Sequence, residues 1–405
     1  MPSSDPPIRL AFLGADENTA ALAGHALAEG AFELRGLWDA PRSLDPPLAA
    51  VADRMGVYPG SAWETLLDDD RIDAVVVARG PDEDLRAEQL RKFAQTGRPV
   101  LVSHPVVTSM LIYYELDMIR AETGAVMVPL LGMRSHPAVR TLAEIVSQGD
   151  SSPVGRIEQL SFERFAAADD KAQVQRLFAR DVDLVRSIAG DMTRLGAMSA
   201  GGGASQYANL GVQMTGPADI AARWAIVPPH GASGARISLS GTGGRVLLDA
   251  PDDGSPWTLE FAGDPDAGRE YPPVDEPAEA LRLLAEAGRG EPPKPDWVDA
   301  CRSVELAETI ERSLNKNRTI ELYYEDYTED ATFKGTMTSI GCGLLVFTLV
   351  LLALVGIAEQ MRIPFVGAWK YVMVAVFGVF LLVQLVMFTS GKRREESRPV
   401  EPSAD

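Results

Sequence analysis

Two arginines spaced four residues apart are the first side chains that could do chemistry. Arg176 and Arg180 stand in the run RLFAR, and this spacing places both on one face of a helix. Arginine stays protonated in proteins, so neither can accept a proton, but its planar fork matches the oxygens of a carboxylate or phosphate. The pair could bind a small anionic ligand, or it could form ion pairs on a solvated helix face, which the sequence slightly favours.

Three further side chains could move protons. Asp181 and Asp183 follow directly, where they could serve a bound ligand or pair with Arg180 and Arg186 on the helix face. His104 stands ahead of a proline, and the unperturbed histidine pKa of about 6.5 suits proton transfer near neutrality. A histidine in that position can also be purely structural. His104, Asp181 and Asp183 are therefore the candidate catalytic residues.

The sequence predicts neither a metal site nor a P-loop. Its four histidines are dispersed and lack the spacing that metal ligands show with cysteines or acids. The glycine clusters at 201–203 and 241–244 do not precede a Lys-Ser/Thr helix start. Only Cys301 and Cys342 are present, which leaves no disulfide framework and fits a reducing compartment.

The overall charge argues against one class of partner. The chain carries 57 acidic against 38 basic residues, a formal net charge of −19. Such a surface repels polyanions. We therefore expect no nucleic-acid partner.

Alternating strands and helices must position these groups. A short apolar run from Ile8 ends at Gly14, a helical stretch follows, and a second strand ends at Asp39. Further strands and helices continue this order, which predicts a doubly wound parallel sheet that binds ligands at the carboxyl ends of its strands. We expect a Rossmann-like dinucleotide-binding domain over residues 1–125. Its candidate cofactor-binding residues are Gly14, Asp39, Pro81, Ser103 and His104.

The pattern of polar and apolar residues changes after about Gly132. Longer runs of alternating polar and apolar residues, such as RIEQLSFERF and ARISLSG, predict an antiparallel sheet. The segment DWVDACRSVELAETIERSLNK predicts a long amphipathic helix. We expect residues 126–330 to form an α+β domain for substrate binding or oligomerisation.

Two uncharged apolar runs occupy the C-terminal end. They span about 336–358 and 366–389, and each is long enough to cross the roughly 30 Å hydrocarbon layer as a helix. The basic residues 392–394 follow, which the positive-inside rule places in the cytoplasm. The sequence therefore predicts that 331–405 is a two-helix transmembrane hairpin in a lipid bilayer. This gives a membrane localisation with the soluble body and the basic tail in the cytoplasm.

The order of these elements resembles the Gfo/Idh/MocA family of NAD(P)-dependent oxidoreductases, which act largely on sugars, inositols and related polyols. The resemblance covers about residues 8–325. It rests on the first strand with Gly14, on Asp39, on the segments VVVARGP and VLVSHP, on MRSHP with Arg134, and on the helix containing Trp297. It implies an NAD or NADP cofactor, with NAD favoured by Asp39, and a polyol ligand near Arg134.

Three departures from the family pattern concern its chemistry. The phosphate loop G-x-G-x-x-[GA] reads GADENT here, so Asp16 and Glu17 bring carboxylates to the helix end that would hold a pyrophosphate. The E-K-P motif reads SHP, which puts His104 in place of the lysine. The catalytic D-x-x-x-H pair is replaced by Arg176 and Arg180.

Three functions follow. We predict a membrane-anchored member of the family with degenerate catalytic motifs that senses a ligand or acts as a scaffold. The alternative is an active NAD-dependent dehydrogenase of a sugar or polyol, in which His104, with Asp181 or Asp183, transfers the proton. The third is a structural membrane component that docks a partner. A homo-oligomer formed through the second sheet is left open by all three.

Overall fold

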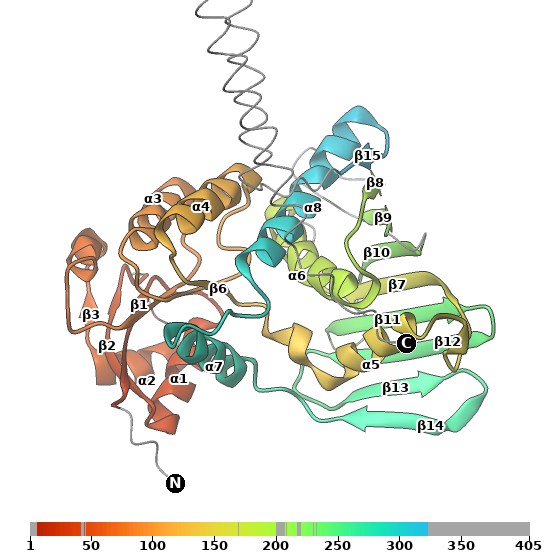
Figure 1. The fold of residues 1–405 in the computed structure, drawn as a ribbon, viewed down its shortest axis with the longest axis horizontal. Helices are drawn as coiled ribbons and strands as arrows, with labels where there is room; N and C mark the ends of the chain where they lie inside the picture. The colour runs from red at the N-terminus through yellow and green to blue at the C-terminus, as the bar shows by residue number, and fades with distance from the viewer. Residues whose placement is uncertain are drawn as a thin grey trace, which may run out of the picture. The chain divides into compact units, whose positions relative to one another are not determined.

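The computed structural model describes residues 6–322, apart from 42–43, 45, 169, 200–206, 208, 217–219, 230 and 232. Two sheets are built within this part of the chain (Figure 1). Helices that follow the second sheet in sequence pack back against the first, so both sheets share their helical cover.

The first sheet has six parallel strands in the order β3-β2-β1-β4-β5-β6. The chain reverses direction of winding between β1 and β4, the place where such sheets open a crevice at their strand ends. The strands are β1 (Ile8–Leu13), β2 (Phe32–Trp38), β3 (Val57–Tyr58), β4 (Ala74–Val77), β5 (Val100–Val102) and β6 (Met127–Pro129). The predicted Rossmann-like sheet is confirmed.

Continuous apolar runs explain the inner strands of this sheet. Every residue of Ala74–Val77 and Val100–Val102 is buried, as expected for strands covered on both faces. The connecting helices are α1 (Thr19–Glu29), α2 (Pro46–Met55), η1 (Gly60–Leu66), α3 (Glu83–Ala94) and α4 (Met110–Thr123).

The second sheet has nine strands in the order β14-β13-β12-β11-β7-β10-β9-β8-β15. Strands β7 and β10 run parallel and the other pairs are antiparallel, so the expected antiparallel sheet is in fact mixed. A long helix between β7 and β8 makes this possible, because parallel neighbours need a crossover. The strands are β7 (Ile157–Phe165), β8 (Arg194–Met198), β9 (Gly211–Thr215), β10 (Ala221–Val227), β11 (Gly234–Gly241), β12 (Gly244–Pro251), β13 (Trp257–Phe261), β14 (Asp264–Tyr271) and β15 (Ile320–Glu321).

Helices α6 and α8 carry the contacts that matter for the site. Helix α6 begins after Asp170, whose side chain accepts from the Gln173 N–H, and packs on β7 and β10. Helix α8 begins with a capping box at Asp296 and packs on both α4 and α6. The helices in this part of the chain, α6 and α8 included, are η2 (Gly132–Ser135), α5 (Pro137–Ser147), η3 (Gly149–Ser151), α6 (Lys171–Ala189), α7 (Glu276–Gly288) and α8 (Trp297–Lys316).

The C-terminal part of the predicted fold class needs correction. No helix in the described part of the chain is long and apolar enough to cross a membrane. The expected spans 336–358 and 366–389 and the basic tail lie outside the described residues. The expectation rested on apolar composition, which by itself does not define a helix. The fold class is corrected to a Rossmann-like parallel sheet followed by a mixed sheet, and the bilayer partner and membrane localisation are not retained.

Candidate functional site

The turn after β1 is held together by the side chain of Asp16. Its carboxylate accepts from the Asn18 N–H at 3.0 Å and from the Arg79 N–H at 3.0 Å, and Thr19 Oγ1 accepts from the Asp16 N–H at 2.9 Å. Gly14 adopts a positive φ of 76°, which favours glycine. The protein's own carboxylate therefore binds one N–H group of the turn that begins α1, where an anionic ligand would otherwise be held, and one N–H group of the loop after β4.

Arg79 joins the loops that follow β1, β4 and β5. Its guanidinium pairs with Glu17 at 3.0 Å, and its Nε donates to the carbonyl of Pro105 at 3.0 Å. Asp16 thus accepts from the backbone N–H of Arg79, and Glu17 pairs with its guanidinium. These contacts link the three loops at the strand ends where the crevice opens.

Arg86 of α3 fills the space beside Gly14. A Cβ atom placed on Gly14 would lie 2.5 Å from Arg86 Nη2, and one placed on Gly80 would lie 2.6 Å from the same atom. Arg86 is only 2% exposed and donates to Asp39 at 3.1 Å and to Gln89 at 2.7 Å. Burial lowers the pKa of Arg86, while Asp39 acts against this shift. A buried guanidinium therefore lies between the ends of β1 and β4.

Asp39 is half-buried, and Gly60 approaches it from the other side. It follows β2 with a positive φ of 54°, and a Cβ atom on Gly60 would lie 2.5 Å from its Oδ1. Its second oxygen accepts from Arg86. The carboxylate that the resemblance assigns to an adenosine ribose is thus engaged by the protein.

The other predicted cofactor residues stand at neighbouring strand ends. Ser103 is buried, and its N–H donates to the carbonyl of Val77. Pro81 is exposed, one residue before Asp82, whose side chain caps α3. The structure places both along the same edge of the first sheet as Gly14.

His104 is buried behind this edge. It is 2% exposed, its ring meets Tyr113 edge-on, and neither ring nitrogen makes a well-formed hydrogen bond within the described residues. Burial lowers the pKa of His104 to about 3, although the Ala179 carbonyl favours the protonated ring, and Arg180 lowers the pKa further. The ring is neutral at physiological pH.

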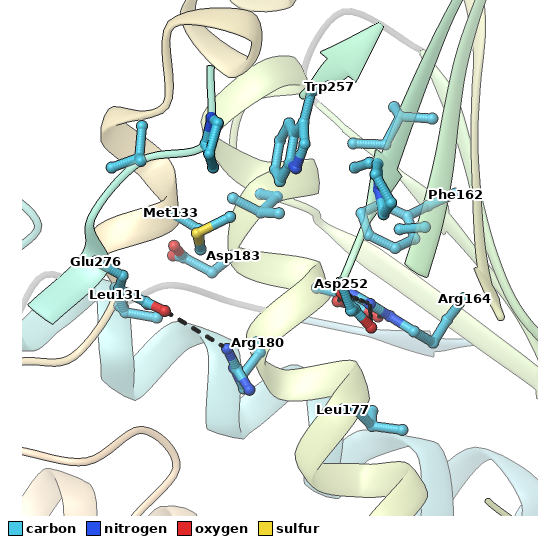
Figure 2. Close-up of a pocket in the computed structure, with 18 of the residues that line it drawn as sticks. Leu131, Met133, Phe162, Arg164, Leu177, Arg180, Asp183, Asp252, Trp257 and Glu276 are labelled. Atoms are coloured by element: carbon cyan, nitrogen blue, oxygen red, sulfur yellow. Dashed lines mark hydrogen bonds and ion pairs between the residues drawn. The ribbon is translucent and has the colours of Figure 1, made fainter. Parts of the chain in front are cut away.

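A cavity of about 380 Å³ lies where the second sheet meets α6, η2 and the start of α7 (Figure 2). This volume falls within the usual range of small-molecule sites. Its polar lining residues are Arg164, Arg180, Asp181, Asp183, Asp252, Ser255 and Glu276. Apolar and aromatic side chains, including Phe162 and Trp257, complete the walls.

Asp181 accepts three hydrogen bonds from residues of the second sheet. Its carboxylate accepts two hydrogen bonds from Arg164 of β7 and one, at 2.9 Å, from the indole N–H of Trp224. Arg164 also pairs with Asp252 at 3.2 Å. Asp181 therefore fixes α6 to the sheet.

Asp183 belongs to a second ionic cluster. Its Oδ1 lies 3.0 Å from Arg134 and 3.4 Å from Arg186, and the side chain is 1% exposed. Arg134 also pairs with Asp299 of α8 at 2.8 Å. Burial raises the pKa of Asp183 to about 6, against the opposing effect of Arg134.

The two arginines of α6 differ in position. Arg180 lines the cavity, where its Nη2 lies 3.8 Å from Glu276 at the start of α7 (Figure 2). Arg176 lies one turn earlier, does not line the cavity, and makes no ion pair with any residue that the structure describes. Of the predicted site residues, Arg180, Asp181 and Asp183 thus line the cavity. Arg134 does not line it, but forms an ion pair with Asp183.

Residues 8–128 match the family described as the oxidoreductase family with an NAD-binding Rossmann fold. The predicted resemblance to the Gfo/Idh/MocA oxidoreductases is confirmed. Among curated proteins, none matches the sequence.

Solved structures extend the likeness over both sheets. A myo-inositol dehydrogenase from Corynebacterium glutamicum is 17% identical, with a TM-score of 0.60 over 79% of this chain and 100% of that one. An aldose-aldose oxidoreductase from Caulobacter crescentus, complexed with glycerol, gives 16% identity and a TM-score of 0.63 over 78% and 100%. A levoglucosan dehydrogenase complexed with NADH and L-sorbose gives 15% and 0.63 over 79% and 100%. At these identities the likeness shows the fold.

The crevice of this Gfo/Idh/MocA fold does not fit a dinucleotide as it stands. A pyrophosphate needs close approach to the turn at Gly14, and a ribose needs a free acceptor at Asp39. Arg86 lies beside the first position and donates one hydrogen bond to the second. Asp16 and Glu17 add negative charge at the same helix end.

Sequence reasoning missed Arg86 and Glu276. A signal for Arg86 existed, because it shares the i, i+4, i+7 stripe of Leu90 and Phe93, and a lone arginine on an apolar face implies a buried partner. Glu276 carried no local signal. It reaches the cavity only because α7 begins beside η2, and a Cβ on Gly132 would lie 2.9 Å from its Cγ.

Proposed function

We propose that this chain is a sugar- or polyol-binding protein that uses an oxidoreductase fold without hydride transfer. Its role is to sense or present a small ligand held in the cavity of the second sheet. The observation that carries the proposal is the burial of Arg86 between Gly14 and Gly80, paired with Asp39. The ligand class is suggested by the relatives, which bind glycerol or L-sorbose in the same fold.

The polar groups of the cavity support binding more than chemistry. Arg180 stands where the family has a histidine and cannot accept a proton from an alcohol. Asp181 accepts two hydrogen bonds from Arg164 and one from Trp224, so it is held in a structural ion pair. Asp183 remains the one predicted proton acceptor at the cavity wall, held by Arg134.

An active dehydrogenase that uses His104 has less support. His104 is buried and does not line the cavity, and its lowered pKa leaves a weak base. A proton relay needs a group within hydrogen-bond reach of the substrate hydroxyl. His104 lies outside the lining of the cavity in which the ligand is proposed to bind.

Calorimetric titration of the full chain with NAD, NADH, NADP and NADPH tests the proposal. We expect no saturable binding below about 1 mM for the unmodified chain, and binding at least about tenfold tighter after Arg86→Ala opens the crevice. Arg91→Ala is the matched control, because Arg91 lies on the same helix and pairs with Glu115 near the surface.

Micromolar binding to the unmodified chain, roughly −8 kcal/mol, would overturn the proposal. So would turnover of any polyol with one of these dinucleotides. A thermal melt of each variant, recorded beside the titration, separates loss of binding from loss of folding.

A further inference from the structure

The cavity lining contains more carboxylates than cations. Four carboxylates and two guanidinium groups line it: Asp181, Asp183, Asp252 and Glu276 against Arg164 and Arg180. The charge of Arg164 is already shared between two of these carboxylates, Asp181 and Asp252. Arg134 and Arg186 pair with Asp183 from outside the lining, so Glu276 is the lining carboxylate whose only ion pair within the described residues is the long one with Arg180.

Two of the carboxylates flank the same short helix, η2. Arg134 of η2 binds Asp183 at 3.0 Å, and Gly132 of η2 packs against Glu276. Arg180 approaches Glu276 only to 3.8 Å, longer than a hydrogen bond, and its side chain is 38% exposed. Glu276 is thus only weakly neutralised.

Burial disfavours the ionised form of both carboxyl groups. Burial raises the pKa of Asp183 to about 6 and also raises the pKa of Glu276, in each case against a nearby arginine. An added cation at this wall would stabilise both ionised forms. Their surroundings suit a positively charged ligand group.

Aromatic rings form another part of the lining. The indole of Trp257 stacks on His136 at 3.8 Å and is a cavity-lining group, as is Phe162 (Figure 2). Aromatic faces bind the apolar face of a ring and attract ammonium groups. Carboxylates and aromatic faces together suit a ligand that has a cationic end and a carbon ring.

We propose that the cavity binds a small polyol that carries a protonated amino group, with the ammonium beside Glu276 and Asp183 and the ring against Trp257. This deepens the proposed function and rests on it. The amine adds ion pairs with desolvated carboxylates that a neutral polyol cannot form.

The test compares glucosamine, glucose and glucuronate as calorimetric probes of the full chain at pH 7. We expect glucosamine to bind at least about tenfold tighter than glucose, and glucuronate to bind weakest. Glu276→Gln should reduce the preference for glucosamine over glucose about fivefold or more. Glu279→Gln is the matched control, since Glu279 lies on the same helix and pairs with Arg282 outside the cavity.

The relative affinities of the three sugars separate this inference from the proposed function. Equal binding of glucosamine and glucose would overturn this inference and leave the proposed polyol function standing. Binding of none of the three would contradict both. A preference that survives Glu276→Gln as fully as it survives Glu279→Gln would show that Glu276 does not recognise the amine.

Discussion

The crevice of the first sheet and the cavity beside the second have both lost family motifs, with different results. In the crevice the replacing residues Asp16 and Glu17 both bind Arg79, and the retained Asp39 pairs with Arg86. In the cavity a volume of about 380 Å³ remains, and Arg180 stops 3.8 Å short of Glu276.

Geometry explains the difference. The loops of a parallel sheet end at one edge, so opposite charges placed on them meet over short distances. The cavity walls come from separate elements, among them β7, η2, α6 and the start of α7. Arg164 pairs with Asp181 and Asp252 on one wall, whereas Arg180 lies 3.8 Å from Glu276 on another. The comparison teaches that a lost motif closes a site only where compensating charges can reach each other.

The largest expected effect concerns the wall of the cavity. Arg164→Leu leaves Asp181 buried with one remaining donor, Trp224, and we expect the free energy of unfolding to fall by about 3–5 kcal/mol in urea titrations. Adding Asp181→Leu should recover most of that loss, because an apolar pair of similar volume replaces a buried ion pair. If the single variant loses under 1 kcal/mol, the wall is loosely held and the open cavity is not a fixed feature.

A pH series sharpens the comparison from the crevice side. The folded state holds His104 with its pKa lowered to about 3, so below pH 6.5 the unfolded chain binds a proton that the folded chain does not. The stability contributed by the neutral ring is complete above pH 6.5 and decreases as the pH falls toward 3. Between pH 6.5 and 4.5 we expect a loss on the order of 2–3 kcal/mol.

Urea titrations of the unmodified chain and of His104→Gln over this range provide the measurement. The difference in unfolding free energy between the two proteins should shrink steadily as the pH falls. Parallel curves would mean that His104 is accessible to protons in the folded state, which would revive its candidacy as a proton-transfer residue.

The sequence predicts the first sheet well because its signals are local. Apolar strands that alternate with helices define β1 to β6, and the switch point follows from their order. The mixed second sheet was less accessible, since the parallel pairing of β7 with β10 joins segments about sixty residues apart and depends on the crossover through α6. Local patterns do not encode such pairings.

For the site, the sequence shows which residues replace the family motifs better than it shows which residues contact one another. Replacement of the phosphate loop and of the acid–histidine pair was visible at Asp16 and Arg180, because both fall in short motifs. The pairing of Asp39 with Arg86 was not, since it joins residues 47 positions apart on different loops. Long side chains reach partners that no motif spacing records.

The smallest expected effect tests whether Arg86 really fills the crevice. Gly80 has no need of a positive φ, but a Cβ there would lie 2.6 Å from Arg86 Nη2, and Asp39 and Gln89 restrain that side chain from moving away. Gly80→Ala should therefore cost about 1–2 kcal/mol of unfolding free energy. In an Arg86→Ala background the same change should cost almost nothing, so a double-mutant cycle yields a coupling of about 1 kcal/mol or more. Gly24→Ala, where an added Cβ meets nothing within 4 Å, serves as the control. Purely additive effects would place the guanidinium elsewhere, and the crevice would then be as open as the cavity.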